Sequence, residues 1–108
     1  MTFAYTVHAF FDDQAVATQW AAWLQNGHLA DVLAAGAGSA ELVQLAPLEL
    51  EARYWFADAV AFAKYEEQSA PKLRAEGLAK FPASRGVRLS RSTGEVLLRL
   101  PLSSPRDR

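Results

Sequence analysis

Alternation of apolar and polar residues predicts two β-strands that organise the rest of the chain. Residues 49–57, Glu-Leu-Glu-Ala-Arg-Tyr-Trp-Phe-Ala, are apolar at every second position from Leu50 to Phe56. Residues 3–11 alternate in the same way, with apolar side chains at every second position from Phe3 to Phe11. A period of two is typical of a strand with one buried face. Each strand is therefore predicted to direct an apolar face toward a hydrophobic core.

Helical spacing of apolar residues follows each of these strands. Asp12-Asp13 supplies an N-cap for a helix over 14–26, and Asn26-Gly27 suits a C-cap or kink before a short helical piece over 28–35. Asp58 caps a helix that runs to about residue 68. Pro71 begins another that ends at Pro82, because proline is tolerated in a first helical turn. The expected core positions of the 58–68 helix are Val60, Phe62, Ala63 and Tyr65.

The remaining segments complete a recognisable order of elements. Residues 39–45 form a strand, and the short turn at Ala46-Pro47 makes it an antiparallel partner of the 49–57 strand. Residues 86–90 and 95–100 are expected to be two short strands around a hairpin turn at Ser92-Thr93-Gly94. The order β-α-β-β-α-β predicts an α+β, ferredoxin-like plait with a small C-terminal hairpin. We expect one domain over 1–100 and a flexible tail over 101–108.

The plait has a consequence for partners, because its helices cover only one face of the sheet. The side chains predicted on the uncovered face are Thr6, His8, Phe10, Glu51, Arg53 and Trp55. Burying Phe10 and Trp55 would contribute about 2 to 3 kcal/mol each. A second copy that lays its own sheet over the first would bury them. We therefore expect a homodimer, with Thr6, Phe10 and Trp55 at its interface.

The same face supplies most of the residues that could hold a ligand. The candidates are His8, His28, Glu51, Arg53 and Trp55. Glu51 and Arg53 lie two apart on one strand and point the same way. They could pair with each other, pair across a dimer or hold a ligand. A histidine could transfer a proton near neutral pH, or it could be a hydrogen-bonded interior residue.

Composition narrows the classes of function. Eleven basic and twelve acidic residues give a net charge of −1, so no general field attracts nucleic acid. The absence of cysteine excludes disulfides and thiolate chemistry, and the two histidines show no metal-binding spacing. No phosphate-binding loop or dinucleotide-binding glycine motif is present, and we expect no cofactor. No metal is expected either, with two histidines and a carboxylate as the remaining alternative. No apolar run approaches the ~18 to 20 residues of a membrane span, and no signal peptide is visible. A cytoplasmic protein without membrane or nucleic-acid partners is expected.

Several segments resemble a known family. They are Tyr65-Glu66, Ser69-Ala70-Pro71-Lys72-Leu73-Arg74-Ala75-Glu76, Phe81 and Ala83-Ser84-Arg85, preceded by Trp20-x-x-Trp23-Leu24 and residues 28–36. In these segments the chain is similar to small uncharacterised bacterial proteins of the dimeric α/β-barrel, ferredoxin-like class. The relatives often carry histidine where this chain has Ser69, and proline where it has Ala30. The first departure argues against a two-histidine site, although His28 matches.

The resemblance implies dimerisation through facing sheets and a cavity between helices and sheet in each subunit, with no established substrate. The wider superfamily includes cofactor-free monooxygenases, isomerases and haem enzymes. Assigning any of these activities to this chain would be an analogy at the level of the fold.

Two interpretations follow. In the first, the protein binds a small organic molecule or is a cofactor-independent enzyme. In the second, it is a non-enzymatic homodimeric assembly or interaction module. A cavity that reaches a histidine favours the first interpretation, and Glu51–Arg53 pairing in a solid interface favours the second.

Overall fold

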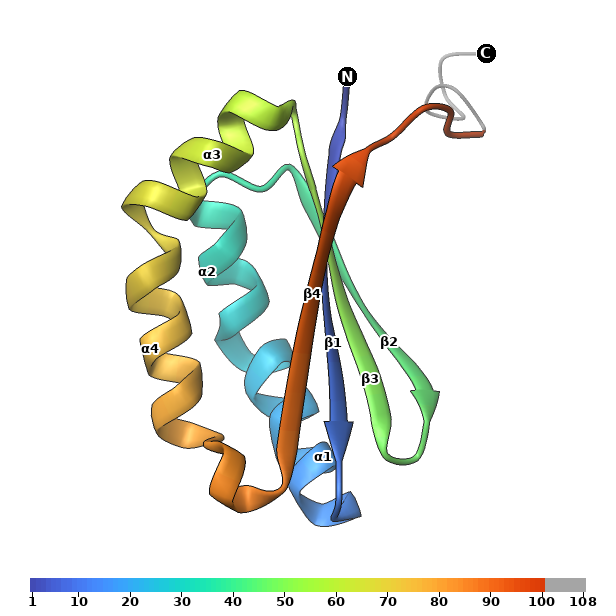
Figure 1. Ribbon diagram of the computed structural model, residues 1–108, viewed down its shortest axis with the longest axis vertical. Helices are drawn as coiled ribbons and strands as arrows, with labels where there is room; N and C mark the ends of the chain where they lie inside the picture. The colour runs from blue at the N-terminus through green and yellow to red at the C-terminus, as the bar shows by residue number, and fades with distance from the viewer. Residues whose placement is uncertain (101–108) are drawn as a thin grey trace.

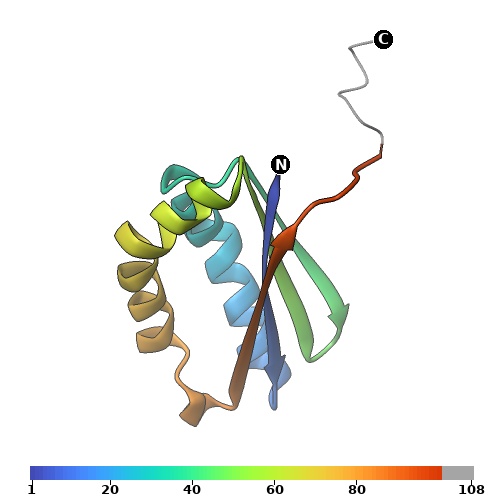
Figure 2. The same cartoon turned by 45° about the horizontal axis from the view of Figure 1, so that its top comes forward.

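Four antiparallel strands form one sheet, and the helices of residues 1–100 lie on one side of it (Figure 1). The computed structural model describes these residues. Its elements are β1 (Phe3–Phe11), α1 (Gln14–Trp23), η1 (Leu24–His28), α2 (Leu29–Ala34), β2 (Ser39–Ala46), β3 (Glu49–Phe56), α3 (Ala59–Gln68), α4 (Ala70–Lys80), η2 (Ala83–Arg85) and β4 (Val87–Glu95). The chain order βαββαβ confirms the ferredoxin-like α+β fold. A second view shows the same two layers, helices against sheet (Figure 2).

The strand order β2-β3-β1-β4 places β1 in the interior of the sheet, between β3 and β4. Tyr5 lies opposite Tyr54 of β3 and Thr93 of β4, and His8 lies opposite Glu51. Because residues directly opposite each other point to the same face, this register determines which face of the sheet each paired side chain occupies. The predicted antiparallel pairing of the second and third strands is also confirmed.

The predicted C-terminal hairpin is wrong. Ser92, Thr93 and Gly94 lie inside the continuous strand β4, each opposite a residue of β1. Strand β1 accounts for this continuous strand. Its nine residues offer hydrogen-bond partners to more backbone groups of β4 than a local hairpin turn would. Beyond β4 the backbone amide of Val96 donates to the carbonyl of Thr2 at 2.8 Å, and residues 96–100 form no strand. The predicted flexible tail, 101–108, lies outside the described residues.

The hydrophobic core fills the space between the helices and the covered face of the sheet. The sheet residues at its centre are each no more than 3% exposed: Tyr5, Ala9, Phe11, Leu50, Ala52, Tyr54 and Phe56. From the helices, Trp20, Leu24 and Tyr65 pack against them. Val60 and Ala63, predicted to be core positions, are exposed, because they fall on the outer side of α3. The side chains of Asp13 and Asp58 accept hydrogen bonds from the first turns of α1 and α3, as expected.

The kink predicted at Asn26-Gly27 is present as a π-helical turn. Gly27 departs from helical geometry inside η1, and the amide of Leu29 donates to the carbonyl of Leu24, five residues earlier. This turn stacks the ring of His28 on that of Trp23, with centroids 4.1 Å apart. In an α-helix, residues five apart point in different directions, whereas in a π-helix they lie about one turn apart. The kink therefore directs His28 inward.

Gly86, in the turn before β4, has a backbone conformation that a residue with a Cβ atom would adopt only with strain. Gly86 has φ +76°, and a Cβ there would lie 2.9 Å from Cβ of Asp12. We predict that Gly86→Ala lowers the free energy of unfolding by about 1 to 3 kcal/mol, measured by urea denaturation. Gly94→Ala is the matched control, because nothing lies within 4 Å of its Cβ position. Equal midpoints for wild type and Gly86→Ala would contradict this account.

Candidate functional site

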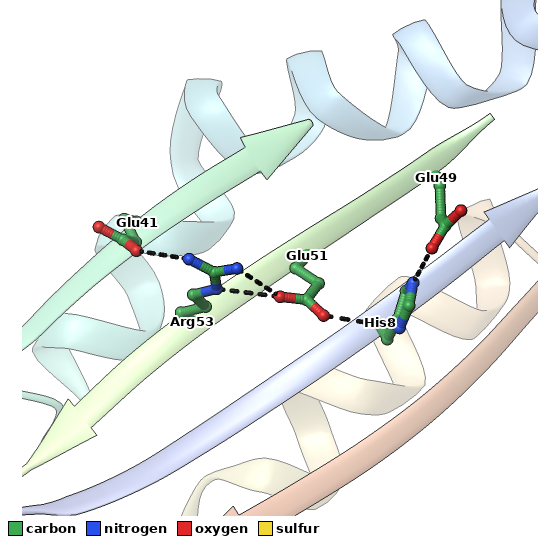
Figure 3. Close-up of polar contacts among 5 residues, drawn as sticks. All are labelled: His8, Glu41, Glu49, Glu51 and Arg53. Atoms are coloured by element: carbon green, nitrogen blue, oxygen red, sulfur yellow. Dashed lines mark hydrogen bonds and ion pairs between the residues drawn. The ribbon is translucent and has the colours of Figure 1, made fainter. Parts of the chain in front are cut away.

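A row of charged side chains crosses the uncovered face of the sheet (Figure 3). Its members come from three adjacent strands: Glu41 of β2, Glu49, Glu51 and Arg53 of β3, and His8 of β1. The register places Glu41 opposite Arg53 and His8 opposite Glu51. The row therefore follows directly from strand alternation and from the neighbouring positions of β1 and β3.

The charges of this row are paired within one protomer. Nη2 of Arg53 lies 2.8 Å from Oε1 of Glu51, and its Nη1 lies 3.2 Å from Oε1 of Glu41. Nε2 of His8 is 2.9 Å from Oε2 of Glu49, and its Nδ1 is 3.6 Å from Oε2 of Glu51. The hydrogen bonds to Glu51 and Glu41 raise the pKa of Arg53. Of the three arrangements considered for Glu51 and Arg53, pairing with each other is the one observed.

Aromatic side chains flank the charged row. Phe10 is 39% exposed and stacks on the ring of His8 at 4.5 Å between centroids. The guanidinium carbon of Arg99 lies 4.8 Å from the centroid of the Trp55 ring, at the other end of β3. Thr6 lies opposite Arg53 and Ser92. All three residues predicted at an interface are therefore on the uncovered face, and Phe10 is the most exposed aromatic side chain there.

His28 lies apart from the other candidate ligand residues, on the helix side of the sheet. It lines a cavity of about 50 Å³, which lies in a hollow of about 560 Å³ that includes open solvent. Apolar and aromatic side chains make up most of the wall: Val7, Trp20, Trp23, Leu24, Ala52, Tyr54, Tyr65, Leu73, Leu78, Phe81 and Leu89. The sequence therefore identified one residue of this cavity, and the structure does not bring His28 together with His8, Glu51, Arg53 or Trp55.

Two arginines meet at a buried tyrosine in the wall of this cavity. The hydroxyl of Tyr5 accepts a hydrogen bond from Nη2 of Arg74 and another from Nε of Arg91, both at 3.1 Å. Arg74 also pairs with Glu66. Burial opposes the charge of Arg74, but the hydrogen bonds to Tyr5 and Glu66 outweigh it and raise its pKa. Helix α4 and strand β4 thus bring two positive charges to the hydroxyl on β1.

Several polar groups around the cavity have no protein partner within residues 1–100. Nδ1 of His28 and Nε of Arg74 are buried without a hydrogen bond. Burial lowers the pKa of His28, although Asp31 and Glu76 act in the opposite direction. Burial also raises the pKa of Tyr65 to about 12 and that of Tyr54 further, so both phenols are neutral. Buried polar groups in proteins are normally hydrogen-bonded, so these two nitrogen atoms of residues in the cavity wall would gain from a polar partner.

Sequence reasoning missed the Tyr5, Arg74 and Arg91 cluster. Tyr5 was assigned to the apolar core, where its ring does lie. Alternation in β4 puts Arg88 on the uncovered face and Arg91 on the helix side, but the predicted hairpin ended that strand before Arg91. Arg74 had no signal except its place in the segment that resembles a known family. Pairing β4 with β1 would have brought Arg91 close to Tyr5, whereas Arg74 comes from α4 and is placed there only by the packing of that helix.

Metal-binding clusters and membrane-spanning helices are both absent from residues 1–100. No group of three histidine, aspartate or glutamate side chains in this range is arranged to hold a metal ion. None of its helices is both long enough and apolar enough to cross a membrane.

Solved structures with the same fold share little sequence with this chain. A dimeric ferredoxin-like protein from an uncultured marine organism has a TM-score of 0.69 at 12% identity, covering 92% of this chain and 97% of its own. The mutant N63A of SnoaB, a cofactor-independent oxygenase from Streptomyces nogalater, has a TM-score of 0.66 at 13% identity, covering 93% and 97%. A monooxygenase from Streptomyces coelicolor, in complex with the ligand nanaomycin D, has a TM-score of 0.63 at 14% identity, covering 90% of each chain. These similarities establish the fold.

The sequence itself assigns a family. No curated protein sequence matches the chain significantly. The family model described as a domain of unknown function, DUF4286, matches residues 3–87, which include the first three strands, all the helices and the first residue of β4. The chain therefore belongs to the DUF4286 family and has the ferredoxin-like fold.

Proposed function

We propose that this protein is a homodimer that binds a small organic molecule in the cavity between its sheet and its helices. The observation that carries the proposal is the cavity itself, with its aromatic wall and its polar groups that lack protein partners. Small-molecule sites are typically concave and mostly apolar, with a few convergent polar groups that orient the ligand. The cavity around Tyr5 and His28 has these properties.

The uncovered face is less suited to a ligand. Arg53 is engaged by Glu41 and Glu51, and His8 contacts Glu51 and Glu49, so their hydrogen-bonding groups are already used. A ligand there would have to displace an internal ion pair. Of the five candidate ligand residues, we therefore retain His28 in the ligand site. We assign His8, Glu51, Arg53 and Trp55 to a contact surface.

A second copy of the chain fits that contact surface. Pairing within the protomer reduces the cost of removing the charged row from water, since unpaired charges are expensive to bury. Phe10 and Trp55 supply apolar surface on this face, and Arg99 of the segment after β4 lies over the Trp55 ring. The similar marine protein is described as dimeric, which supports the proposal. A stable interface of this kind buries about 800 Å² per partner.

The second candidate function is a non-enzymatic assembly module. The internal Glu51–Arg53 pair favours it, because that pair lets the uncovered face serve contact alone. The cavity favours a bound molecule in addition. The similarity to a cofactor-independent oxygenase and a monooxygenase makes an enzyme of that general class the natural extension of the proposal, without indicating a reaction.

Partly blocking the cavity should weaken binding of a neutral aromatic probe. Leu78 lines the cavity and is 56% exposed, so Leu78→Trp should partly fill the mouth without disturbing the core. We predict that 2-naphthamide binds the wild-type protein and binds Leu78→Trp at least about tenfold more weakly, measured by isothermal titration calorimetry. Val60→Trp is the matched control on the outer side of α3. Equal binding to both variants would exclude this cavity as the site.

Charge introduced at Phe10 should separate the proposed dimer. Phe10→Glu would place a further carboxylate beside Glu49 and Glu51, and the dissociation constant should rise by about tenfold or more. Sedimentation equilibrium measures it, with the 11.8 kDa chain as the monomer. Val60→Glu should leave the dimer unchanged. A wild-type protein that sediments as a monomer at micromolar concentration would refute the dimer.

Burial favours the neutral form of the His28 ring, which makes the folding stability of the protein depend on pH. Because burial lowers the pKa of His28 from 6.5, the unfolded chain takes up this proton before the folded chain does. Its contribution to stability is therefore present above about pH 6.5 and is lost as the pH falls below that value. We predict that the unfolding free energy decreases less between about pH 7.5 and 5.5 in His28→Phe than in wild type, by urea denaturation. His8→Phe is the control, and identical decreases in wild type and His28→Phe would contradict the prediction.

A further inference from the structure

We infer that the ligand of this cavity is a planar aromatic molecule with an anionic oxygen, which Arg91, Arg74 and the hydroxyl of Tyr5 bind together. This inference rests on the proposed function and specifies the chemistry of its ligand. Three features of the cavity wall carry it: the hydrogen-bonding geometry at Tyr5, the balance of charge around it, and the aromatic surfaces beside it.

The hydrogen bonds at Tyr5 leave only donors for a ligand. A phenol oxygen has two lone pairs, and here Arg74 and Arg91 each donate to it at 3.1 Å. Its own hydrogen is then the group that remains for another partner. Nε of Arg74 is a further donor, buried without a partner in the described part of the chain. A ligand atom that approaches this cluster must therefore accept hydrogen bonds.

The charges of the cluster do not cancel. Glu66 pairs with Arg74. Arg91 forms no ion pair with a carboxylate among residues 1–100, and its hydrogen bond is to the neutral oxygen of Tyr5. Two guanidinium groups against one carboxylate leave one positive charge at the cavity. Guanidinium groups bind carboxylate and similar anionic oxygens with strong, directional hydrogen bonds, so an anion is favoured over a neutral or cationic group.

Arg91 is also placed so that it can change partners at low cost. Its side chain is exposed and comes from β4, whereas Arg74 is partly buried on α4. An exposed guanidinium is solvated without a ligand, and it can turn its terminal nitrogens toward an anion while Nε remains at Tyr5. Arg74 fixes the position of the hydroxyl, and Arg91 supplies the uncompensated charge.

Aromatic surfaces in the wall favour a flat ligand. The stacked rings of Trp23 and His28 lie on one side, and Phe81 packs against Trp23 with centroids 5.6 Å apart. Tyr54 and Tyr65 are almost fully buried in the same wall, and their phenols are neutral donors. Aromatic side chains bind flat rings through offset or edge-to-face contacts. The cavity wall thus offers partners for both halves of one molecule, a ring and an anionic oxygen.

The test compares two probes of equal shape, 2-naphthoate and neutral 2-naphthamide, by isothermal titration calorimetry. We expect wild-type protein to bind the naphthoate at least about tenfold more tightly. Arg91→Gln should remove most of this preference, because it should weaken binding of the naphthoate more than binding of the naphthamide. Arg88→Gln is the matched control, because Arg88 lies three residues away on the same strand but pairs with Asp12 on the other face. It should retain the preference.

The outcomes separate this inference from the proposed function. Equal affinity of wild type for both probes, or an undiminished preference in Arg91→Gln, would overturn the anionic ligand and leave the cavity as a binding site. An equal loss in Arg88→Gln would also overturn it, because a general charge effect would then explain the preference. Binding of neither probe would count against the cavity as an aromatic ligand site and would overturn both proposals.

Discussion

The structure depends on the unequal covering of a single sheet. Four strands present two faces, and helices α1 to α4 cover one of them (Figure 1). Strand alternation sends Tyr5, Ala52 and Tyr54 to the covered face and His8, Glu51 and Arg53 to the other. Because adjacent residues of a strand face opposite sides, a ligand cavity and a contact surface can be built from the same two strands. The proposed ligand cavity and the proposed contact surface therefore lie on opposite faces of one sheet.

Polar side chains on the two faces of the sheet differ in whether they have partners within the chain. On the uncovered face, Glu41, Glu49 and Glu51 are paired with Arg53 or His8 within the protomer. On the covered face, His28 and Arg74 retain buried nitrogen atoms without partners in residues 1–100. Leaving a buried polar group unpaired costs about 1 to 3 kcal/mol. A protein that keeps such groups around a cavity gains most from a ligand that satisfies them, which is why the cavity carries the functional proposal.

A local irregularity in the first helical segment shapes the cavity wall. The π-helical turn η1 brings His28 onto Trp23, an arrangement that a regular α-helix would not allow. Without it, His28 would point in a different direction from Trp23, and the cavity would lose both a polar atom and part of its aromatic wall. Single π-turns are often found at functional sites, and this one lies at the candidate site.

The sequence alone determined the features that depend on neighbours along the chain. Alternation predicted β1 and β3 and their two faces, Asp13 and Asp58 marked helix starts, and Asn26-Gly27 marked the kink. The open-face set followed from the same local spacing, whereas the pairing of Glu51 with Arg53 was one of three arrangements that the spacing allowed.

Only the tertiary structure decided what depends on distant partners. Ser92-Thr93-Gly94 has the composition of a turn, yet it forms a strand because β1, more than eighty residues earlier, offers its backbone groups. Tyr5, Arg74 and Arg91 likewise come from β1, α4 and β4, so no local pattern connects them. Period and capping are short-range effects of the backbone, whereas a cavity exists only where separate elements pack. That physical difference explains why the fold was predictable and most residues of the proposed ligand site were not.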